Sequence, residues 1–283
     1  MTVRIGTVWD STQQVLAGRA GMMAPFALIG FVLPGVLQIL LLPSSPGPSG
    51  MGVTGLGLVI LSMLLGIWAQ LAIMALATHP ATTSAEASRA GLRRLGPVLG
   101  VALVIGLVLA LAVLVVVVVL GLSHFNFAAA MAAKGDPSKL PPMSGGTALF
   151  LVLYVLTMIV VSLWLAARLM LMYAVVLNER RGLGAIRRSI ALTRGLTWRL
   201  IGVLLLFGVV MLVAMMAVQG VSGAVLRLLL GADQALTAVR LAGLLGSLVS
   251  AGFMTLAYVF VARLYVATAG EQAHREEVGS PSL

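Results

Sequence analysis

The sequence predicts an all-α polytopic membrane protein with six transmembrane helices. Of its 283 residues, 60% are hydrophobic and only 9% are charged, whereas soluble domains carry about 25% charged residues. Near-unbroken apolar runs of about twenty residues recur six times, and a helix of that length crosses the roughly 30 Å hydrocarbon core of a bilayer. The basic residues gather on alternate connections between these runs, as expected for a chain that crosses a membrane repeatedly.

The predicted spans follow from run length and from the charged or helix-breaking residues that bound each run. They cover residues 21–43, 54–77, 97–121, 147–172, 199–219 and 241–266. Pro25 and Pro34 predict a kink in the first span, because proline lacks the backbone donor of a helical residue. The fifth span is expected to loosen or end near Gln219 and Gly220, with residues 224–239 lying on the outer surface of the membrane.

The distribution of basic residues predicts the orientation. One side is formed by the two termini and by the second and fourth connections, and it holds Arg4, Arg19, Arg89, Arg93, Arg94, Arg180, Arg181, Arg187, Arg188, Arg194, Arg199 and Arg275. The other side holds Lys134, Lys139, Arg227 and Arg240. Because membrane proteins keep their basic connections on the cytoplasmic side, this distribution predicts a multi-pass protein with both termini in the cytoplasm.

A short amphipathic helix is predicted on the cytoplasmic interface before each of spans one, three and five. The second of these helices opens with Thr83 and Glu86, the spacing of a capping box. Apolar residues at helical spacing indicate one stripe on each helix. The stripes are Ile5, Val8, Trp9, Thr12, Val15 and Leu16; then Ala85, Ser88, Leu92 and Leu95; then Leu183, Ile186, Ile190 and Thr193.

The order of interfacial helix, span and span occurs three times, which predicts a threefold internal repeat. Gln70, Arg168 and Arg263 each stand late in an even-numbered span, 98 and 95 positions apart. Chance similarity among helices rich in alanine and leucine is the alternative. The predicted repeats cover residues 5–78, 83–178 and 182–269, within a single membrane domain of residues 1–270 that is followed by a short polar tail, residues 271–283.

The stretch between spans four and five carries a recognisable motif. It reads AARLMLMYAVVLNERRGLGAIRRSIALTRGLTWRLIGVLLL, from Ala166 to Leu206. An arginine, an acidic residue, a helix of the form Ala-x-x-x-Ser-x-x-Leu-Thr-x-Gly and an aromatic residue follow one another, at Arg168, Glu179, Ala185, Ser189, Leu192, Thr193, Gly195 and Trp198. This pattern resembles the membrane domain of bacterial glycerophosphoryl diester phosphodiesterases and of their free-standing relatives. The segment AEASRAGLRRLGPVLG, from Ala85, resembles the matching first-half segment.

The resemblance implies a membrane module of unknown role and does not bring catalysis with it. In proteins that have the phosphodiesterase, that enzyme is a separate soluble barrel with a divalent cation. Here the three histidines, His79, His124 and His274, are scattered, and the eight acidic residues form no paired set that would bind a metal. The chain has no cysteine for a thiolate site. We therefore expect no enzyme, no cofactor and no metal.

The candidate functional residues are arginines. Arg168 and Arg263 stand inside spans, where a charge is costly and often functional. They could snorkel to the interface or to helix-end carbonyls, or they could bind an anionic headgroup. Arg263 is expected to snorkel and Arg168 to make the more specific contact, since Glu179 follows it and could pair with it. Glu179 could equally pair with one of the arginines at 180–188.

Four further arginines form a dense patch on the inner side. The candidate contacts to anionic lipid are Arg168, Arg187, Arg188, Arg194, Arg199 and Arg263. For the patch, nonspecific attraction to anionic lipid is the simplest interpretation, and specific docking of a lipid or of a membrane protein is the alternative. Nucleic acid is not an expected partner, because no aromatic residues interleave with the arginines and Trp198 is better explained as an interface anchor.

These observations favour a non-enzymatic integral inner-membrane protein that engages lipid or scaffolds a partner in the bacterial envelope. The alternative is a small-solute or lipid transporter, or a permease subunit. Transporter sites usually place polar residues at mid-depth on broken helices, and spans one, three and four are nearly bare of such residues. An enzyme acting within the bilayer ranks third, because the sequence contains no recognisable nucleophile and base.

Overall fold

A computed structural model of the chain describes residues 3–41, 52–132, 136, 139, 141–231 and 234–279. Over these residues the protein is almost entirely helical and contains no strand. Six of the described helical segments are long and apolar enough to cross a membrane, namely Ile5–Leu41, Val53–Thr78, Ser84–Leu122, Gly145–Asn178, Thr197–Leu230 and Leu236–Ala273. The prediction of an all-α polytopic membrane protein is confirmed.

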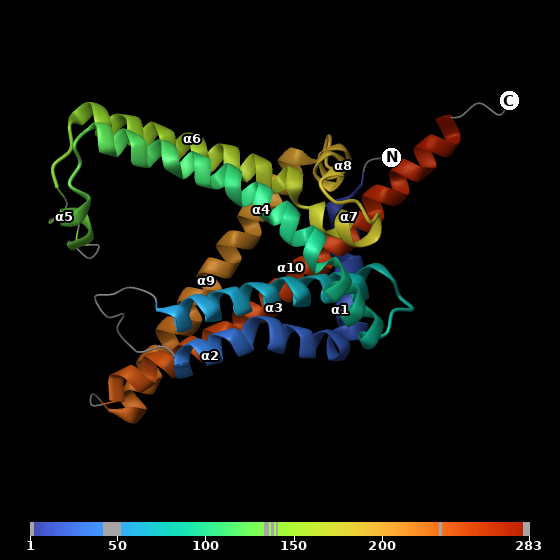
Figure 1. The fold of residues 1–283 in the computed structure, drawn as a ribbon. Helices are drawn as coiled ribbons and strands as arrows, with labels where there is room; N and C mark the ends of the chain where they lie inside the picture. Colours follow the sequence, from blue (N-terminus) through green and yellow to red (C-terminus); the bar gives the residue numbers. More distant parts are fainter. Residues whose placement is uncertain are drawn as a thin grey trace. The chain divides into compact units, whose positions relative to one another are not determined.

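Within the described ranges, the helices follow one another with turns and short connections between them (Figure 1). They are α1 (Ile5–Ala27), the π-helical turn η1 (Leu28–Val32), α2 (Leu33–Leu41), α3 (Val53–Thr78), α4 (Ser84–Leu122), α5 (Phe127–Ala132), α6 (Gly145–Leu169), α7 (Met172–Asn178), α8 (Gly184–Leu192), α9 (Thr197–Leu230) and α10 (Ala235–Gly279). Lys134, residues 42–43 of the first predicted span and residues 280–283 of the predicted tail lie outside the described residues.

Two boundaries differ from the prediction. Helix α9 continues through Gln219 and Gly220 to Leu230, so the helix does not end near residue 219, which was one of the two expectations. One glycine in a strongly apolar helix weakens it without ending it. The end comes instead at Gly231, whose φ of 81° is a conformation that glycine adopts without strain. At the C-terminus, α10 extends to Gly279, so the described part of the predicted polar tail is helical.

The chain forms two compact units. The main unit comprises the described residues within 1–98 and 167–283, and the hairpin unit comprises residues 99–166. The division in α4 falls next to Pro97, which removes a hydrogen bond from the helical ladder. In the hairpin unit, the Tyr154 hydroxyl of α6 donates to the Ala112 carbonyl of α4 at 2.7 Å. Large apolar side chains cover the outside of both hairpin helices, as a lipid environment requires.

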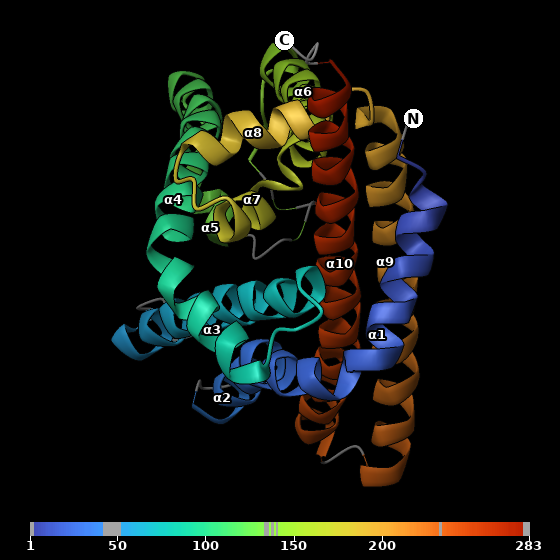
Figure 2. The same cartoon turned by 90° about the vertical axis from the view of Figure 1, so that its right-hand side faces the viewer.

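Helix α10 is the central element of the main unit: α9 and α1 lie alongside it, and α3 packs against it at an angle (Figure 2). Buried side chains gather in three segments: residues 69–78 at the end of α3, residues 171–177 at α7, and residues 259–268 of α10. The opposite ends of α3 and α9 expose their leucines and valines. The main unit is therefore most tightly packed at one end, which also carries most of its arginines and is called the arginine-rich end below.

The irregularity predicted from Pro25 and Pro34 takes the form of η1, which lies between the two prolines. Gly30 of η1 crosses α3 at Ala69 so closely that a Cβ placed on Gly30 would lie 2.2 Å from the Ala69 Cβ. That separation is far below any van der Waals contact, so only glycine fits at this crossing. The π-helical turn therefore brings the backbones of the first two spans together.

The three predicted interfacial helices take two forms. The first is the beginning of α1 and the second is the beginning of α4, each continuous with the span that follows, whereas the third is the separate helix α8. The predicted capping box is confirmed: the Thr83 backbone N–H donates to Glu86 Oε2 at 2.9 Å, and the Glu86 backbone N–H donates to Thr83 Oγ1 at 3.4 Å. The chain leaves α8 through Gly195, whose φ is 86°.

Small residues form the buried faces of the second and third of these helices. On α4 the fully buried alanine is Ala87, while Leu92 of the predicted stripe is 56% exposed. On α8 the buried residues include Ala185 and Ser189, while Leu183 is 59% exposed. Small side chains allow two helices to approach closely in a membrane protein. Of the large residues in these two predicted stripes, Leu92 and Leu183 are thus exposed, whereas Leu95, Ile186 and Ile190 are half-buried.

Candidate functional site

The arginine-rich end is built where the ends of α3, α7 and α10 pack together. Three alanines that hold equivalent positions in the predicted repeats, Ala69, Ala167 and Ala262, are all fully buried there. An alanine at each position leaves room for a neighbouring helix to approach. This shared burial supports the threefold repeat, which remains a prediction.

Each predicted interfacial helix packs on the end of a span from the preceding repeat. A Cβ on Gly91 of α4 would lie 3.1 Å from the Trp68 carbonyl oxygen of α3. The Ser189 hydroxyl of α8 donates to the Arg168 carbonyl of α6 at 2.8 Å. Arg263 Nε of α10 donates to the Ser11 hydroxyl of α1 at 2.7 Å. The three contacts follow one another in a closed cycle, in which the third repeat returns to the first.

Arg168 lies in a reciprocal contact between the end of α6 and the end of α8. Its Nη1 donates to the Ile190 carbonyl at 3.2 Å, while its own carbonyl accepts from Ser189 at 2.8 Å and from Thr193 Oγ1 at 3.3 Å. The last carbonyls of a helix have no partner within the helix, and a cation near that end is favourable. Of the two predicted roles of Arg168, the structure contains the contact to a helix-end carbonyl.

Arg263 and Arg19 both donate hydrogen bonds to backbone carbonyls at the end of α3. Arg19 Nη1 donates to the carbonyls of Leu76 at 2.7 Å and His79 at 3.1 Å. Arg263 Nη1 donates to the Ala77 carbonyl at 3.5 Å. Two guanidinium groups, one from α1 and one from α10, therefore converge on carbonyls that α3 itself leaves without helical partners. Arg19 was not among the candidate residues from the sequence.

Glu179 is the centre of a polar network at the same end. Its carboxylate pairs with Arg188 at 3.0 Å and with Arg181 at 3.1 Å, and the Tyr265 hydroxyl donates to it at 3.3 Å. Arg188 Nη1 also donates to Gln272 Oε1 at 2.7 Å. The sequence left open which arginine pairs with Glu179, and the pair with an arginine at 180–188 is present. Arg188 is thus held between α7 and α10.

The other arginines of the predicted patch are exposed. Arg187, Arg194 and Arg199 all have exposed side chains on α8, on the turn after it and at the start of α9. Arg194 also lines a pocket of about 390 Å³ with Glu271 and Gln272 of α10. The six candidate residues therefore separate into three that are tied to neighbouring helices, Arg168, Arg188 and Arg263, and three whose charges face the surroundings.

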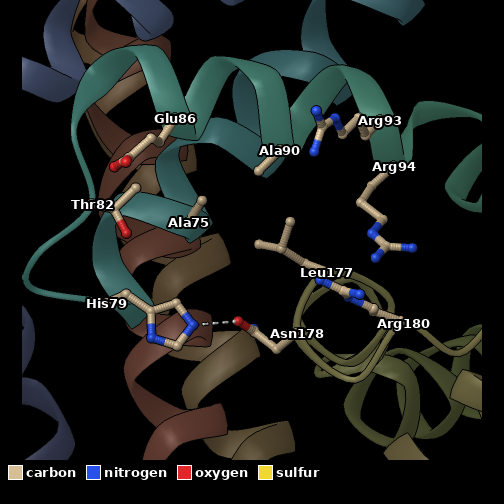
Figure 3. A pocket seen from close by; sticks show the side chains of 10 residues that line it. All are labelled: Ala75, His79, Thr82, Glu86, Ala90, Arg93, Arg94, Leu177, Asn178 and Arg180. Atoms are coloured by element: carbon tan, nitrogen blue, oxygen red, sulfur yellow. Dashed lines mark hydrogen bonds between the residues drawn. The ribbon is translucent and has the colours of Figure 1, made fainter.

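A second pocket lies between α3, α4 and the end of α7, and the sequence did not predict it (Figure 3). Its volume is about 380 Å³, and its polar lining consists of His79, Thr82, Glu86, Arg93, Arg94, Asn178 and Arg180. His79 Nε2 lies 3.1 Å from Asn178 Oδ1. The Asn178 amide nitrogen donates to the Ala174 carbonyl at 2.8 Å, so its oxygen is left to accept from His79. Every lining residue belongs to the main unit.

One signal for this pocket was present in the sequence. His79 and Asn178 stand 99 positions apart, close to the spacing of 98 that separates Gln70 from Arg168. Applying the repeat to the residues just beyond each even-numbered span gives His79 and Asn178 nearly equivalent positions, which singles out both residues without predicting their contact. The arginines of α4 carry no such signal, because any basic residue on this side is already explained by topology.

These features define a multi-pass α-helical membrane protein with a dense cluster of arginines, two pockets and several capped helix ends at one end of its main unit. The chain belongs to the family described as a domain of unknown function (DUF7847), which matches residues 11–268. No curated protein and no solved structure matches the chain. The likeness to phosphodiesterase membrane domains therefore stays a prediction from the sequence.

Proposed function

We propose that this chain is a non-enzymatic membrane protein whose arginine-rich end engages anionic lipid headgroups. The observation that supports this proposal is the exposure of Arg187, Arg194 and Arg199, since exposed arginines near a bilayer attract anionic lipid. Leu183, which directly precedes α8, is also exposed. An exposed apolar side chain beside arginines suits a helix that lies on a charged membrane surface.

The proposed location is the bacterial inner membrane, with the arginine-rich end in the cytoplasm. Cysteine substitutions test this orientation directly, because the chain has no cysteine of its own. Gly182 and Gly146 are both exposed, and a side chain at either position meets nothing within 4 Å. Gly146→Cys should react with a membrane-impermeant maleimide on intact cells, and Gly182→Cys should react only after the membrane is opened. Labelling of Gly182→Cys on intact cells would reverse the orientation.

The lipid proposal is tested by removing the three exposed charges together. Arg187→Gln, Arg194→Gln and Arg199→Gln in one variant should weaken the attraction to anionic lipid by about 1 kcal/mol per charge, which is roughly a hundredfold in affinity. The measurement is the amount of anionic lipid that co-purifies with the protein, together with its salt dependence. The matched control replaces Lys139, Arg227 and Arg240, on the opposite side, by glutamine. Equal lipid in both variants would contradict the proposal.

A further inference from the structure

We infer that the pocket between α3, α4 and the end of α7 is a binding site for one phosphate monoester. This inference deepens the proposed function, because it names a pocket and a ligand chemistry in place of a general attraction to charge. The charged residues that line the pocket are three arginines, Arg93, Arg94 and Arg180, and one carboxylate, that of Glu86. The pocket thus has an excess of two positive charges, which matches a doubly charged phosphate monoester.

The carboxylate of Glu86 is already engaged by Thr83. Glu86 Oε2 accepts from both the backbone N–H and the hydroxyl of Thr83, at 2.9 and 3.0 Å. In Figure 3, Glu86 lies at one end of the pocket, whereas the guanidinium groups of Arg94 and Arg180 lie at the other. A phosphate at that end meets donors and little repulsion. Guanidinium groups suit this ligand because each presents parallel N–H donors to two phosphate oxygens.

The backbone segments that carry Arg94 and Arg180 are positioned by helix packing and by backbone conformation. Arg94 extends from helix α4, which Gly91 packs closely against α3. Arg180 has a φ of 56°, a left-handed conformation that residues with a side chain adopt at a cost in energy. Glycine would occupy that position without strain. The bond between His79 and Asn178, at 3.1 Å, joins the two chain segments that form the floor.

The size and place of the pocket limit the ligand. A volume of about 380 Å³ lies at the lower end of the range for small-molecule sites, so a phosphate with a small alcohol fits and a folded partner does not. Ala75, Ala90 and Leu177 complete the lining with apolar surface. The same phosphate chemistry could come from a lipid headgroup such as phosphatidic acid or from a soluble ester such as glycerol 3-phosphate, and the experiment separates these sources.

The test measures binding to the full chain in nanodiscs of neutral phosphatidylcholine. Glycerol 3-phosphate is titrated by calorimetry, and phosphatidic acid or phosphatidylglycerol is added to the nanodiscs and counted by native mass spectrometry. We expect one equivalent of a phosphate monoester, lipid or soluble, to bind saturably. Phosphatidylglycerol, a singly charged diester, should bind at least tenfold more weakly. Equal binding of the diester, or no saturable binding of either monoester, would overturn the inference.

Two variants assign the binding to this pocket. Arg94→Gln and Arg180→Gly should each weaken binding at least tenfold. Arg180→Gly removes the charge while relieving the left-handed backbone, so its melting temperature should equal or exceed that of the native chain. Arg89→Gln, an exposed arginine of the same helix that does not line the pocket, should bind as the native chain does. Unchanged binding in both pocket variants would place the site elsewhere and refute the inference.

The outcome is separable from that of the proposed function. The variant without Arg187, Arg194 and Arg199 retains the whole pocket, so it should still bind one equivalent of the monoester while its general attraction to anionic lipid falls. Loss of monoester binding in that variant would mean that the exposed patch, and not the pocket, holds the phosphate. Normal lipid attraction in that variant together with intact pocket binding would refute only the proposed function.

Discussion

Gly30→Ala is expected to destabilise the main unit strongly, although it adds a single methyl group. A Cβ at this position would lie 2.2 Å from the Ala69 Cβ, 3.0 Å from the Leu65 carbonyl oxygen and 3.6 Å from the Ala69 Cα. Two of these neighbours are backbone atoms, and the third, the Ala69 Cβ, is bonded directly to the backbone. None of them can therefore move away by a change of side-chain rotamer. Overpacking of a close-packed interior costs about 1–3 kcal/mol, and here the strain can be relieved only by separating η1 from α3.

Moving the methyl group from position 69 of α3 to position 30 of η1 tests this explanation. Ala69→Gly added to Gly30→Ala removes the closest contact and should restore most of the lost stability, measured by thermal unfolding in detergent. The control is Gly21→Ala on α1, where a new Cβ meets nothing within 4 Å and alanine is the better helix former. If Gly30→Ala unfolds at the temperature of the native chain, or if Ala69→Gly gives no rescue, the crossing is less close than described.

The helices were predictable because their signals lie within short stretches of sequence. Run length alone locates the spans, and the interval from Thr83 to Glu86 is enough to predict a capping box that the structure contains. The end of α9 was missed for the same reason. Gln219 and Gly220 resemble a local stop signal, yet a long apolar helix continues through them to Gly231.

The candidate site was predictable only in part, because its contacts join distant segments. An arginine inside a span is visible in the sequence, but its acceptor here is a backbone carbonyl, which has no sequence signature. Arg168 donates to Ile190 and Arg19 to Leu76, and neither acceptor could have been chosen in advance. The close helix contacts at small residues could not be located from the sequence either. The chain has 32 glycines, and at most of the described ones an added Cβ would meet nothing, so a glycine alone does not indicate a helix crossing.

The closing contact of the cycle, between Arg263 and Ser11, is expected to have the second large effect. The two residues are 252 positions apart and their bond, at 2.7 Å, joins the last helix to the first. Arg263 also reaches the Ala77 carbonyl at the end of α3. Arg263→Met keeps the length of the side chain and removes every donor. Because hydrogen bonds from charged groups contribute about 1.5–3 kcal/mol, we expect a loss of that size in the free energy of unfolding.

Arg263→Lys separates charge from geometry. Lysine keeps the charge that favours a helix C-terminus but lacks the planar fork that serves two acceptors in different directions. It should therefore recover only part of the stability lost in Arg263→Met. Arg199→Met is the control, because Arg199 is exposed on α9 and surface substitutions usually change stability by less than about 0.5 kcal/mol.

A double-mutant cycle with Ser11→Ala decides whether the bond itself closes the bundle. If it does, Arg263→Met and Ser11→Ala should couple by about 0.5–3 kcal/mol, whereas independent sites add to within about 0.3–0.5 kcal/mol. Simple additivity would mean that α1 is held on α10 by apolar packing alone, as at the buried Val8 and Met23. Coupling would mean that a polar contact at the arginine-rich end fixes the order of the helices. In that case the arginines inside the spans stabilise the fold. The candidates for ligand binding are then Arg94, Arg180 and the exposed arginines of the patch.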